Sequence, residues 1–310
     1  MKARTPMPAP LLEAALTPTH LPKGRPEGRP SLDGLRGEGG NGGRPSPQPL
    51  SPGERGEPVA PRTPSPPGKR WPEGPDEGVA AIGALDWAGI ERDLEAYGCA
   101  IAPKLISRET CREIAALYPD DARFRSCIVM AAHGFGRGEY KYFADPLPER
   151  IVALRRGFYP RLAPIADRWN EAMGVSVRYP GEHDAFLKRC HEAGQKRPTP
   201  LLLRYGPGDY NCLHQDVYGE HLFPLQIAIL LSEPGRDFTG GEFVLTEQRP
   251  RMQSRAEVAP LAQGDGIIFA VRDRPVKGTR GTYRVNLRHG VSRIRSGERF
   301  TLGIIFHDAA

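Results

Sequence analysis

Cysteine is scarce in this sequence, and its spacing excludes a disulfide framework. Five cysteines occur in 310 residues, an odd number, and no two of them form a C-x-x-C pair. Secreted domains that depend on disulfides are richer in cysteine and carry it in even numbers. The pattern therefore predicts a reducing compartment, with the cytoplasm as the default location.

Long apolar runs are also missing. No stretch approaches the roughly 18 apolar residues that a membrane-spanning helix needs. A short apolar stretch follows Lys2 and Arg4, but Glu13 interrupts it, so we expect no signal peptide. The sequence thus predicts no membrane partner, and it carries no signal for an oligomeric state.

The first 80 residues have few apolar side chains to bury. They contain 18 prolines and 13 glycines, which is 31 of 80 positions. That composition, without a period, is typical of disorder. We therefore expect a disordered Pro/Gly-rich segment over 1–80, either a flexible tail or an over-long start. The remaining 81–310 suits one folded domain.

Acidic residues are depleted in one part of that domain. From Arg272 to Arg299 there are nine lysines or arginines and only two acidic residues, whereas the whole chain carries a net charge of +6. Such a basic strip would attract an anionic cosubstrate or substrate. A solvated strand and loop surface is the alternative interpretation.

The hydrophobic pattern changes along the domain from helical to strand-like. Helical patterns cover 85–97, 107–118, 151–169 and 184–193, with Pro160 and Pro164 expected to kink or split the third. Short apolar strands are predicted at 99–102, 124–132, 201–203, 225–231, 242–245, 267–270, 283–287 and 301–306. The fold class that follows is α+β, with supporting helices over 81–200 and a jelly-roll core over 201–310.

Three residues in the β-rich part have the types and spacing of metal ligands. His214 and Asp216 are two apart, so on a strand they point to the same face. His289 lies far downstream, directly before Gly290. Two histidines and one carboxylate, with open positions opposite, form the ligand set of non-haem Fe(II) oxygenases. We predict an iron site at His214, Asp216 and His289; the alternative for the first two is a surface strand pair.

Other polar residues of this part are candidates for neighbouring roles. Arg299 follows His289 by ten residues, and its guanidinium could bind a carboxylate through two hydrogen bonds. His221 and His307 are rival ligands without a partner signal, for which we expect supporting or surface roles.

The residues from Leu201 to Ala310 resemble the Fe(II)/2-oxoglutarate-dependent dioxygenase superfamily. AlkB-type nucleic-acid demethylases in particular are similar in the stretch Arg204-Tyr205-x-Pro207-Gly208 followed by Leu213-His214-Gln215-Asp216. A bacterial subgroup of oxygenases thought to act on damaged nucleic acid is similar over the fuller pattern, which continues through Gly240-Gly241-Glu242-Phe243 and His289-Gly290-Val291-Ser292 to Gly303-Ile304-Ile305-Phe306-His307-Asp308.

The resemblance implies a double-stranded β-helix that holds Fe(II) and uses 2-oxoglutarate and O₂ as cosubstrates. Arg299 matches the basic residue that pairs with the distal carboxylate of 2-oxoglutarate, and Tyr205 matches a tyrosine that hydrogen-bonds the same molecule. The implied reaction is hydroxylation of a C–H bond, which on an N-methyl base leads to demethylation. Nucleic acid would then be the substrate partner, with the base flipped out or single-stranded.

Two positions depart from the AlkB-type pattern. The clamp arginine of those enzymes lies further beyond the distal histidine, and Leu203 stands where they have asparagine. The ten-residue offset of Arg299 is similar to prolyl-4-hydroxylase-like enzymes. Hydroxylation of a protein side chain or small metabolite is therefore an alternative function, and a non-catalytic jelly-roll binding module is a third.

Candidates for substrate contact lie in two places. A loop with three glycines precedes Tyr140, Lys141, Tyr142 and Phe143, and this segment could form a hinged lid over a planar substrate. An ordinary hairpin whose aromatic residues pack inward is the alternative. Arg284 and Arg288, close to His289 in the sequence, are the further candidates for cosubstrate or substrate contacts.

Overall fold

The structure of the protein, a computed structural model, describes residues 76–310. Most of the predicted disordered segment lies outside the described residues. Its last five residues do not, because helix α1 spans Asp76–Ala84, so the prediction of disorder up to residue 80 was wrong there. Gly78 lies so close to Leu154 that an added Cβ would be 3.0 Å from its Cδ2 atom. This glycine allows close helix packing and does not mark a linker.

All four expected helices form, and residues at their ends satisfy free backbone groups. Asp86 accepts a hydrogen bond from the Gly89 N–H, Gly98 ends its helix in the left-handed conformation, and Ser107 caps the next helix. The described helices after α1 are α2 (Trp87–Tyr97), α3 (Arg108–Ala115), η1 (Asp121–Arg123), η2 (Met130–His133), α4 (Glu149–Ala172) and α5 (His183–Glu192). None of them combines the length and the apolar character needed to cross a bilayer.

Helix α4 continues through both of its prolines. Pro160 and Pro164 lie inside it, so the expectation that they might split it was wrong. Its buried stripe, with Leu154, Phe158 and Leu162 at intervals of four residues, extends on both sides of Pro160. Burial of this stripe against the sheet offsets the hydrogen bonds that the prolines remove.

The strands form two main antiparallel sheets and one short pair. The larger sheet has the order β1 (Cys99–Ala102), β11 (Gly266–Ala270), β7 (Leu225–Leu230), β15 (Arg299–Ile304), β5 (Leu201–Tyr205), β4 (Glu139–Phe143), β2 (Phe124–Val129). The smaller sheet has the order β10 (Arg255–Ala259), β9 (Phe243–Gln248), β13 (Gly281–Val291), β6 (Tyr210–His214), β3 (Gly136–Arg137), with β12 (Asp273–Gly278) also paired to β13. The short pair is β14 (Ile294–Gly297) with β8 (Phe238–Gly240). Strands on both sides of residue 200 therefore contribute to each main sheet.

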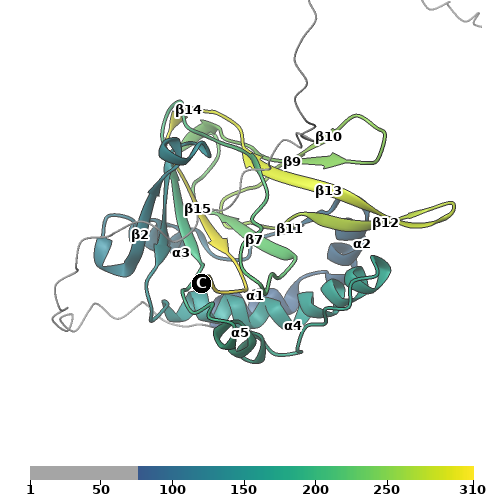
Figure 1. Ribbon diagram of the computed structural model, residues 1–310. Coiled ribbons are helices and arrows are strands. Elements are labelled where there is room, and N and C mark those ends of the chain that lie inside the picture. The colour runs from purple at the N-terminus through teal and green to yellow at the C-terminus, as the bar shows by residue number, and fades with distance from the viewer. Residues whose placement is uncertain (1–75) are drawn as a thin grey trace, which may run out of the picture. The chain divides into compact units, whose positions relative to one another are not determined.

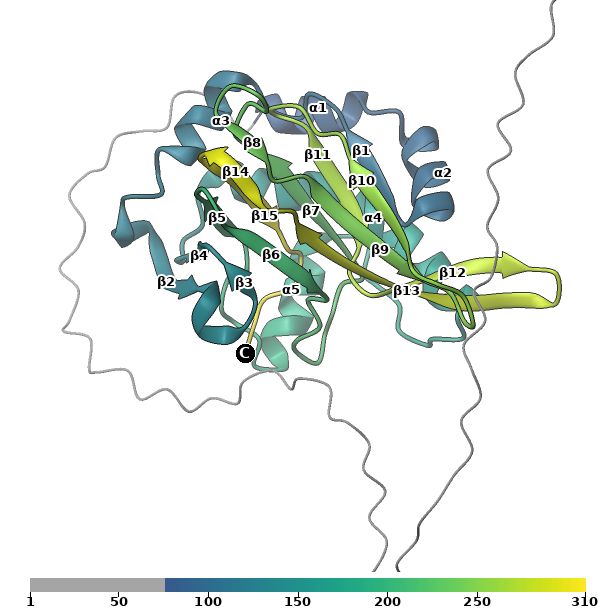
Figure 2. The same cartoon turned by 90° about the horizontal axis from the view of Figure 1, so that it is seen from above.

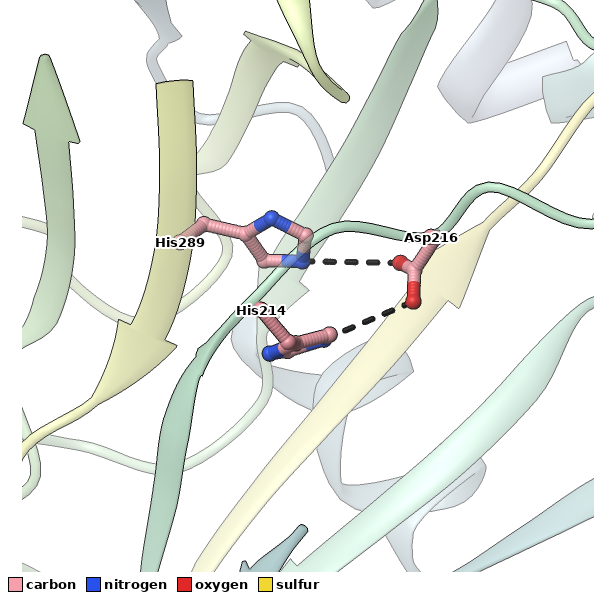
Figure 3. Close-up of side chains that lie close together, drawn as sticks. All are labelled: His214, Asp216 and His289. Atoms are coloured by element: carbon pink, nitrogen blue, oxygen red, sulfur yellow. Dashed lines mark ion pairs between the residues drawn. The ribbon is translucent and has the colours of Figure 1, made fainter. Parts of the chain in front are cut away.

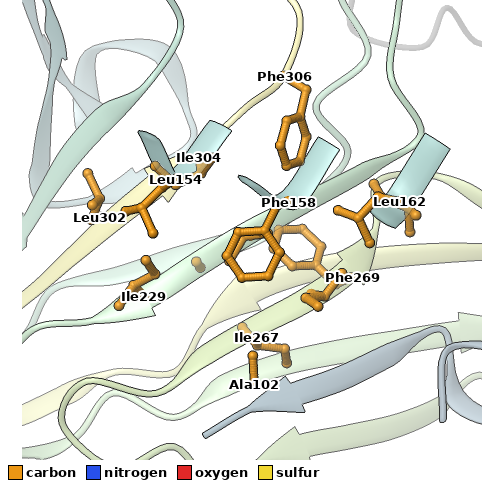
Figure 4. Packing of buried hydrophobic residues seen from close by; sticks show 14 of the residues in the cluster. Ala102, Leu154, Phe158, Leu162, Ile229, Ile267, Phe269, Leu302, Ile304 and Phe306 are labelled. Atoms are coloured by element: carbon orange, nitrogen blue, oxygen red, sulfur yellow. The ribbon is translucent and has the colours of Figure 1, made fainter. Parts of the chain in front are cut away.

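The elements are arranged in layers, with helices α1, α4 and α5 on one side of the strands (Figure 1). Seen from above, the smaller sheet lies in front, the larger sheet behind it, and α4 beyond that (Figure 2). The main core joins the α4 stripe to residues of the larger sheet such as Ile229 and Leu302 (Figure 4). The mixed α+β class and its two-sheet core are as predicted. The candidate site is built on the smaller sheet, where it faces the larger one.

Candidate active site

The two histidines of the predicted triad are neighbours on adjacent strands. His214 ends β6, and its register partner on β13 is His289. Their ring centroids are 4.2 Å apart. His289 is almost fully buried, and Phe243 and Phe269 pack against its ring. The pairing of the strands therefore brings together two imidazoles that are 75 positions apart in the chain.

Asp216 completes the group from just beyond the strand. Its Oδ1 lies 3.4 Å from Nε2 of His214, and its Oδ2 lies 3.4 Å from Nε2 of His289 (Figure 3). One nitrogen or oxygen from each residue lies within 4.8 Å of the others. The sequence predicted this meeting, but it placed Asp216 on the strand with His214. The strand ends at His214, and the chain turns to bring the carboxylate over both rings.

Contacts within the backbone of β6 and β13 hold these side chains in place. His214 Nδ1 lies 2.8 Å from the Cys212 carbonyl, so Nδ1 donates its proton there and Nε2 faces Asp216. Gln215 Nε2 donates to the Leu287 carbonyl at 2.7 Å and ties the turn before Asp216 to β13. Gly290 lets the strands approach closely, because an added Cβ would be 2.7 Å from the Asn211 carbonyl oxygen.

Each of the three side chains shifts the pKa of at least one of the others. Burial would raise the pKa of Asp216, but His214 and His289 outweigh burial and hold that pKa well below its usual range. Burial would lower the pKa of His214, yet Asp216 raises it overall. Burial and the neighbouring His214 lower the pKa of His289. The carboxylate is therefore ionised and His289 is kept neutral, as metal ligation requires, whereas His214 would have to lose any proton on Nε2 when a metal binds.

Arg299 is buried and, among the described residues, has no carboxylate within ion-pair distance. It is 1% exposed, and among the described residues its side chain donates one hydrogen bond, from Nη1 to Thr301 Oγ1 at 2.6 Å. Its Nε has no partner in that part of the chain. Burial lowers the pKa of Arg299 to about 10, so it is still protonated at neutral pH. A buried cation that lacks an anion is costly, and a bound carboxylate would remove that cost.

Tyr205 interacts electrostatically both with this arginine and with Asp216 of the triad. It is the register partner of Arg299, whose guanidinium carbon is 5.7 Å from the phenol ring. The Tyr205 hydroxyl accepts a hydrogen bond from Asn211 Nδ2 at 3.4 Å. Burial raises the pKa of Tyr205 to about 12, while Arg299 lowers it and Asp216 raises it. The phenol is thus within electrostatic reach of both the clamp residue and the triad.

Three further tyrosines are linked to Tyr205 or to one another by contacts and electrostatic interactions. Tyr140 packs on the cluster that contains Tyr205 and meets Tyr142 edge to face, with ring centroids 5.4 Å apart. Burial raises the pKa of Tyr140, and Tyr142 and Asp216 raise it further. Tyr218, which the sequence reasoning missed, has a buried hydroxyl whose pKa is raised by burial, Tyr142 and Asp216. We call Tyr140, Tyr142 and Tyr218 the tyrosine row.

The other half of the predicted aromatic segment faces away from the site. Strand β4 alternates, so Lys141 and Phe143 lie on the face opposite to Tyr140 and Tyr142. Phe143 is fully buried in the main core. Lys141 Nζ donates to the Tyr118 carbonyl at 2.9 Å and pairs with Asp121. The prediction that Lys141 and Phe143 contact substrate was wrong, because alternation along β4 directs both side chains to the face opposite Tyr140 and Tyr142.

The arginines around His289 were also placed wrongly. Arg284 and Arg288 are exposed on the face of β13 opposite to His289, and Arg284 Nη2 bonds the Met173 carbonyl at 2.9 Å. Arg274 of the basic strip is buried and bonds to Glu247 and to two carbonyls of α2. The strip is therefore not one surface around the site. Arg284 and Arg288 are exposed and Arg274 is bound to Glu247, which leaves Arg299 as the candidate for cosubstrate binding.

The two rival histidines do not join the triad. The backbone of His221 exchanges hydrogen bonds with the Gln195 side chain. His307 is fully buried, and its Nδ1 accepts from the Phe223 N–H at 3.3 Å. Neither lies in the ligand group that the described residues form.

A family model described as "Oxygenase, catalysing oxidative methylation of damaged DNA" matches residues 138–309. Uncharacterized proteins from two strains of Mycobacterium tuberculosis are 52% identical over 168 residues, which is 54% of this chain and 72% of the relative. Residues 138–309, which the family model matches, contain the triad, Tyr205, Arg299 and the tyrosine row.

Solved structures with a related fold are more distant. A 2OG-Fe(II) oxygenase family oxidoreductase from Burkholderia pseudomallei is 18% identical, with a TM-score of 0.43 over 73% of this chain and 94% of that chain. A Pseudomonas putida prolyl-4-hydroxylase is 14% identical, with a TM-score of 0.41 over 72% of this chain and 99% of that one. The family assignment rests on the family model and the mycobacterial relatives.

Proposed function

The chain belongs to this family of oxygenases, and from that premise we propose that it uses Fe(II), 2-oxoglutarate and O₂ to oxidise a methyl group on an alkylated nucleic-acid base. The observation that carries the proposal is the buried Arg299 guanidinium, which has Tyr205 opposite it and no carboxylate within ion-pair distance among residues 76–310. A dicarboxylate cosubstrate would supply the missing anion.

The side chains present fit the proposed metal. Two imidazole nitrogens and one carboxylate oxygen within 4.8 Å of one another are the donor set of non-haem Fe(II) oxygenases. The Cys212 carbonyl fixes the His214 tautomer that leaves Nε2 free to ligate. When bound, iron with its cosubstrate supplies the oxidant for a substrate C–H bond.

This chain's residues would bind and orient the reactants. Arg299 and Tyr205 would hold the distal carboxylate of 2-oxoglutarate at the inner end of the site. The buried Phe243 and Phe269, packed on His289, keep water from one side of the triad. The tyrosine row offers ring faces near Asp216 on which a flat base could stack.

The direction of the reaction follows from the chemistry of an oxidised methyl group. Hydroxylation of an N-methyl group gives N–CH₂–OH, which loses formaldehyde and leaves N–H. We therefore propose demethylation, with the base outside a duplex stack when it reacts. The test is incubation of the iron-loaded protein with 2-oxoglutarate and methylated single-stranded oligonucleotides. Formaldehyde and unmethylated base should appear in equal amounts.

The alternative substrates are outcomes of the same experiment. Succinate formation stimulated by peptides or small metabolites, and not by methylated oligonucleotides, would overturn the nucleic-acid part of the proposal and keep the cosubstrate part. Absence of stoichiometric Fe(II) binding would overturn both parts and favour a non-catalytic binding module.

A further inference from the structure

A β-bulge beside the tyrosine row places one arginine over the ring of Tyr142. On β2 and β4, Phe124 pairs with Phe143 and Ser126 pairs with Tyr142, so Arg125 is an extra residue in β2. A bulge of this kind re-aims a side chain that regular alternation would place elsewhere. The Arg125 guanidinium carbon lies 4.4 Å from the centroid of the Tyr142 ring. The bulge thus places a cation against the Tyr142 ring, which also contacts Tyr140.

Arg125 is half-buried and has no carboxylate partner in the part of the chain that the structure describes. Its Nε donates to the Pro198 carbonyl at 2.9 Å. Its other nitrogens make no hydrogen bond or ion pair within residues 76–310. Stacking on Tyr142 and the bond to Pro198 hold the guanidinium plane, which leaves its outer edge available.

A second unpaired arginine lies next to it. Arg197 directly precedes the residue to which Arg125 bonds, and its backbone is held by reciprocal hydrogen bonds with Ala309 at 2.9 and 2.8 Å. Arg197 is exposed and forms no ion pair with any described residue. Burial lowers the pKa of Arg125 and the charge of Arg197 lowers it further, while Tyr142, Tyr218 and Asp308 act in the opposite direction. Two close guanidinium groups repel each other, and an anion between them would relieve that repulsion.

We propose that Arg125, with Arg197 beside it, binds a backbone phosphate of a single-stranded nucleic-acid substrate. The inference rests on the proposed function and adds a position at which the backbone of the nucleic-acid substrate binds. Guanidinium groups bind phosphate oxygens through two hydrogen bonds, and a stacked arginine is already oriented for this. Tyr142 lies between the phosphate site and the triad side of the row, so the nucleoside attached to that phosphate would extend over the tyrosines.

The test measures the affinity of the full-length protein for a fluorescein-labelled, methylated single-stranded DNA over a series of salt concentrations. Fe(II) and 2-oxoglutarate are present without oxygen, so that binding is observed without turnover. Arg125→Gln should weaken binding by about tenfold and reduce the slope of log Kd against log salt by about 0.7, the value for one lost phosphate contact on a single strand. Arg125→Lys should retain the slope and lose part of the affinity.

The matched control is Arg280→Gln. Arg280 is exposed in the turn between β12 and β13, a hairpin that extends on the side away from β2 in both views (Figures 1 and 2). This change removes the same charge and should leave affinity and slope as in the wild type. An equal loss in both variants would overturn the site, because it would show only general charge attraction.

A probe on the nucleic acid removes the dependence on a folded variant. Replacing one phosphodiester near the methylated base by a neutral methylphosphonate should weaken wild-type binding about tenfold at one linkage. The same replacement should have no effect on Arg125→Gln. If methylphosphonate replacement leaves the wild-type affinity unchanged at every linkage, the inference is overturned.

The two levels of proposal fail differently. Formaldehyde release from methylated DNA by the wild type, together with wild-type affinity of Arg125→Gln, overturns the phosphate site alone. A wild-type protein that neither binds nor oxidises the strand overturns the proposed function and the phosphate site together.

Discussion

Arg299 and Tyr205 face each other across β15 and β5, with the guanidinium carbon 5.7 Å from the phenol ring. Both side chains are buried, and neither reaches a carboxylate of the described chain. This pair lies on the larger sheet, whereas His214 and His289 lie on the smaller one. The site therefore depends on the packing of the two sheets, with a cation on one side and a ligand triad on the other.

Replacing this arginine should separate cosubstrate affinity from stability. Arg299→Gln should raise the KM for 2-oxoglutarate by roughly 10- to 100-fold, because it removes a charge-assisted pair of hydrogen bonds. The melting temperature without 2-oxoglutarate should not fall, since the change removes a buried charge that lacks an anionic partner. Steady-state kinetics and thermal unfolding measure the two effects.

The control for this change is Arg295→Gln, which removes the same charge from an exposed position four residues earlier. Its KM for 2-oxoglutarate should equal that of the wild type. If Arg299→Gln instead unfolds the protein and leaves the KM unchanged under stabilising conditions, Arg299 is structural and the cosubstrate assignment is wrong.

Metal binding should depend on the triad and not on the other histidines. His289→Ala and Asp216→Ala should each abolish stoichiometric Fe(II) binding in an anaerobic calorimetric titration, because two ligands do not complete the facial set. His221→Ala should bind one Fe(II) per chain, since that residue lies outside the ligand group. Full Fe(II) binding by His289→Ala would exclude it as a ligand.

The sequence predicted the residues of the site better than their orientations. The triad and Arg299 are recognisable because residue type and spacing are enough to suggest a ligand set and a clamp. Period-two alternation would have excluded Arg284 and Arg288, whose even positions on β13 oppose His289. The same rule divides Tyr140 and Tyr142 from Lys141 and Phe143, but it does not say which pair faces the core.

Other features had no signal in the sequence. The orientation of Arg125 depends on an extra residue in β2, which exists only relative to its partner strand β4. The placement of Tyr218 depends on the turn after Asp216. The Pro/Gly-rich composition around helix α1 predicted disorder. Gly78 contributed to that prediction, although in the structure it allows close packing against Leu154. Each of these depends on long-range packing, which local patterns do not encode.

The close approach of β6 and β13 should be sensitive to one methyl group. Gly290→Ala would place a Cβ 2.7 Å from the Asn211 carbonyl oxygen and push the two histidine strands apart. We expect a loss of roughly 1–3 kcal/mol in the free energy of unfolding, together with weaker Fe(II) binding. Urea denaturation and metal titration measure these effects.

Gly83→Ala is the matched control. Gly83 lies in helix α1, and an added Cβ would meet nothing within 4 Å. This change should leave Fe(II) binding intact and stabilise the protein by roughly 0.5–1 kcal/mol. A Gly290→Ala protein as stable and as tightly metal-bound as this control would show that the strands tolerate separation.

Buried His183 should make the protein less stable in mild acid. Burial and the charge of Arg155 lower its pKa to about 4, against the nearby Asp308, while the unfolded value is 6.5. Between these values the unfolded chain binds the extra proton, so the free energy of unfolding falls as the pH drops. This one residue should account for a loss of about 2 kcal/mol in the free energy of unfolding between pH 7 and pH 5.

The control is His183→Gln, which cannot take up that proton. Its amide can still donate to the Phe306 carbonyl that His183 Nε2 contacts at 2.8 Å. Urea denaturation at the two pH values should therefore show a smaller pH-dependent loss in this variant, and equal losses in both proteins would contradict the assignment.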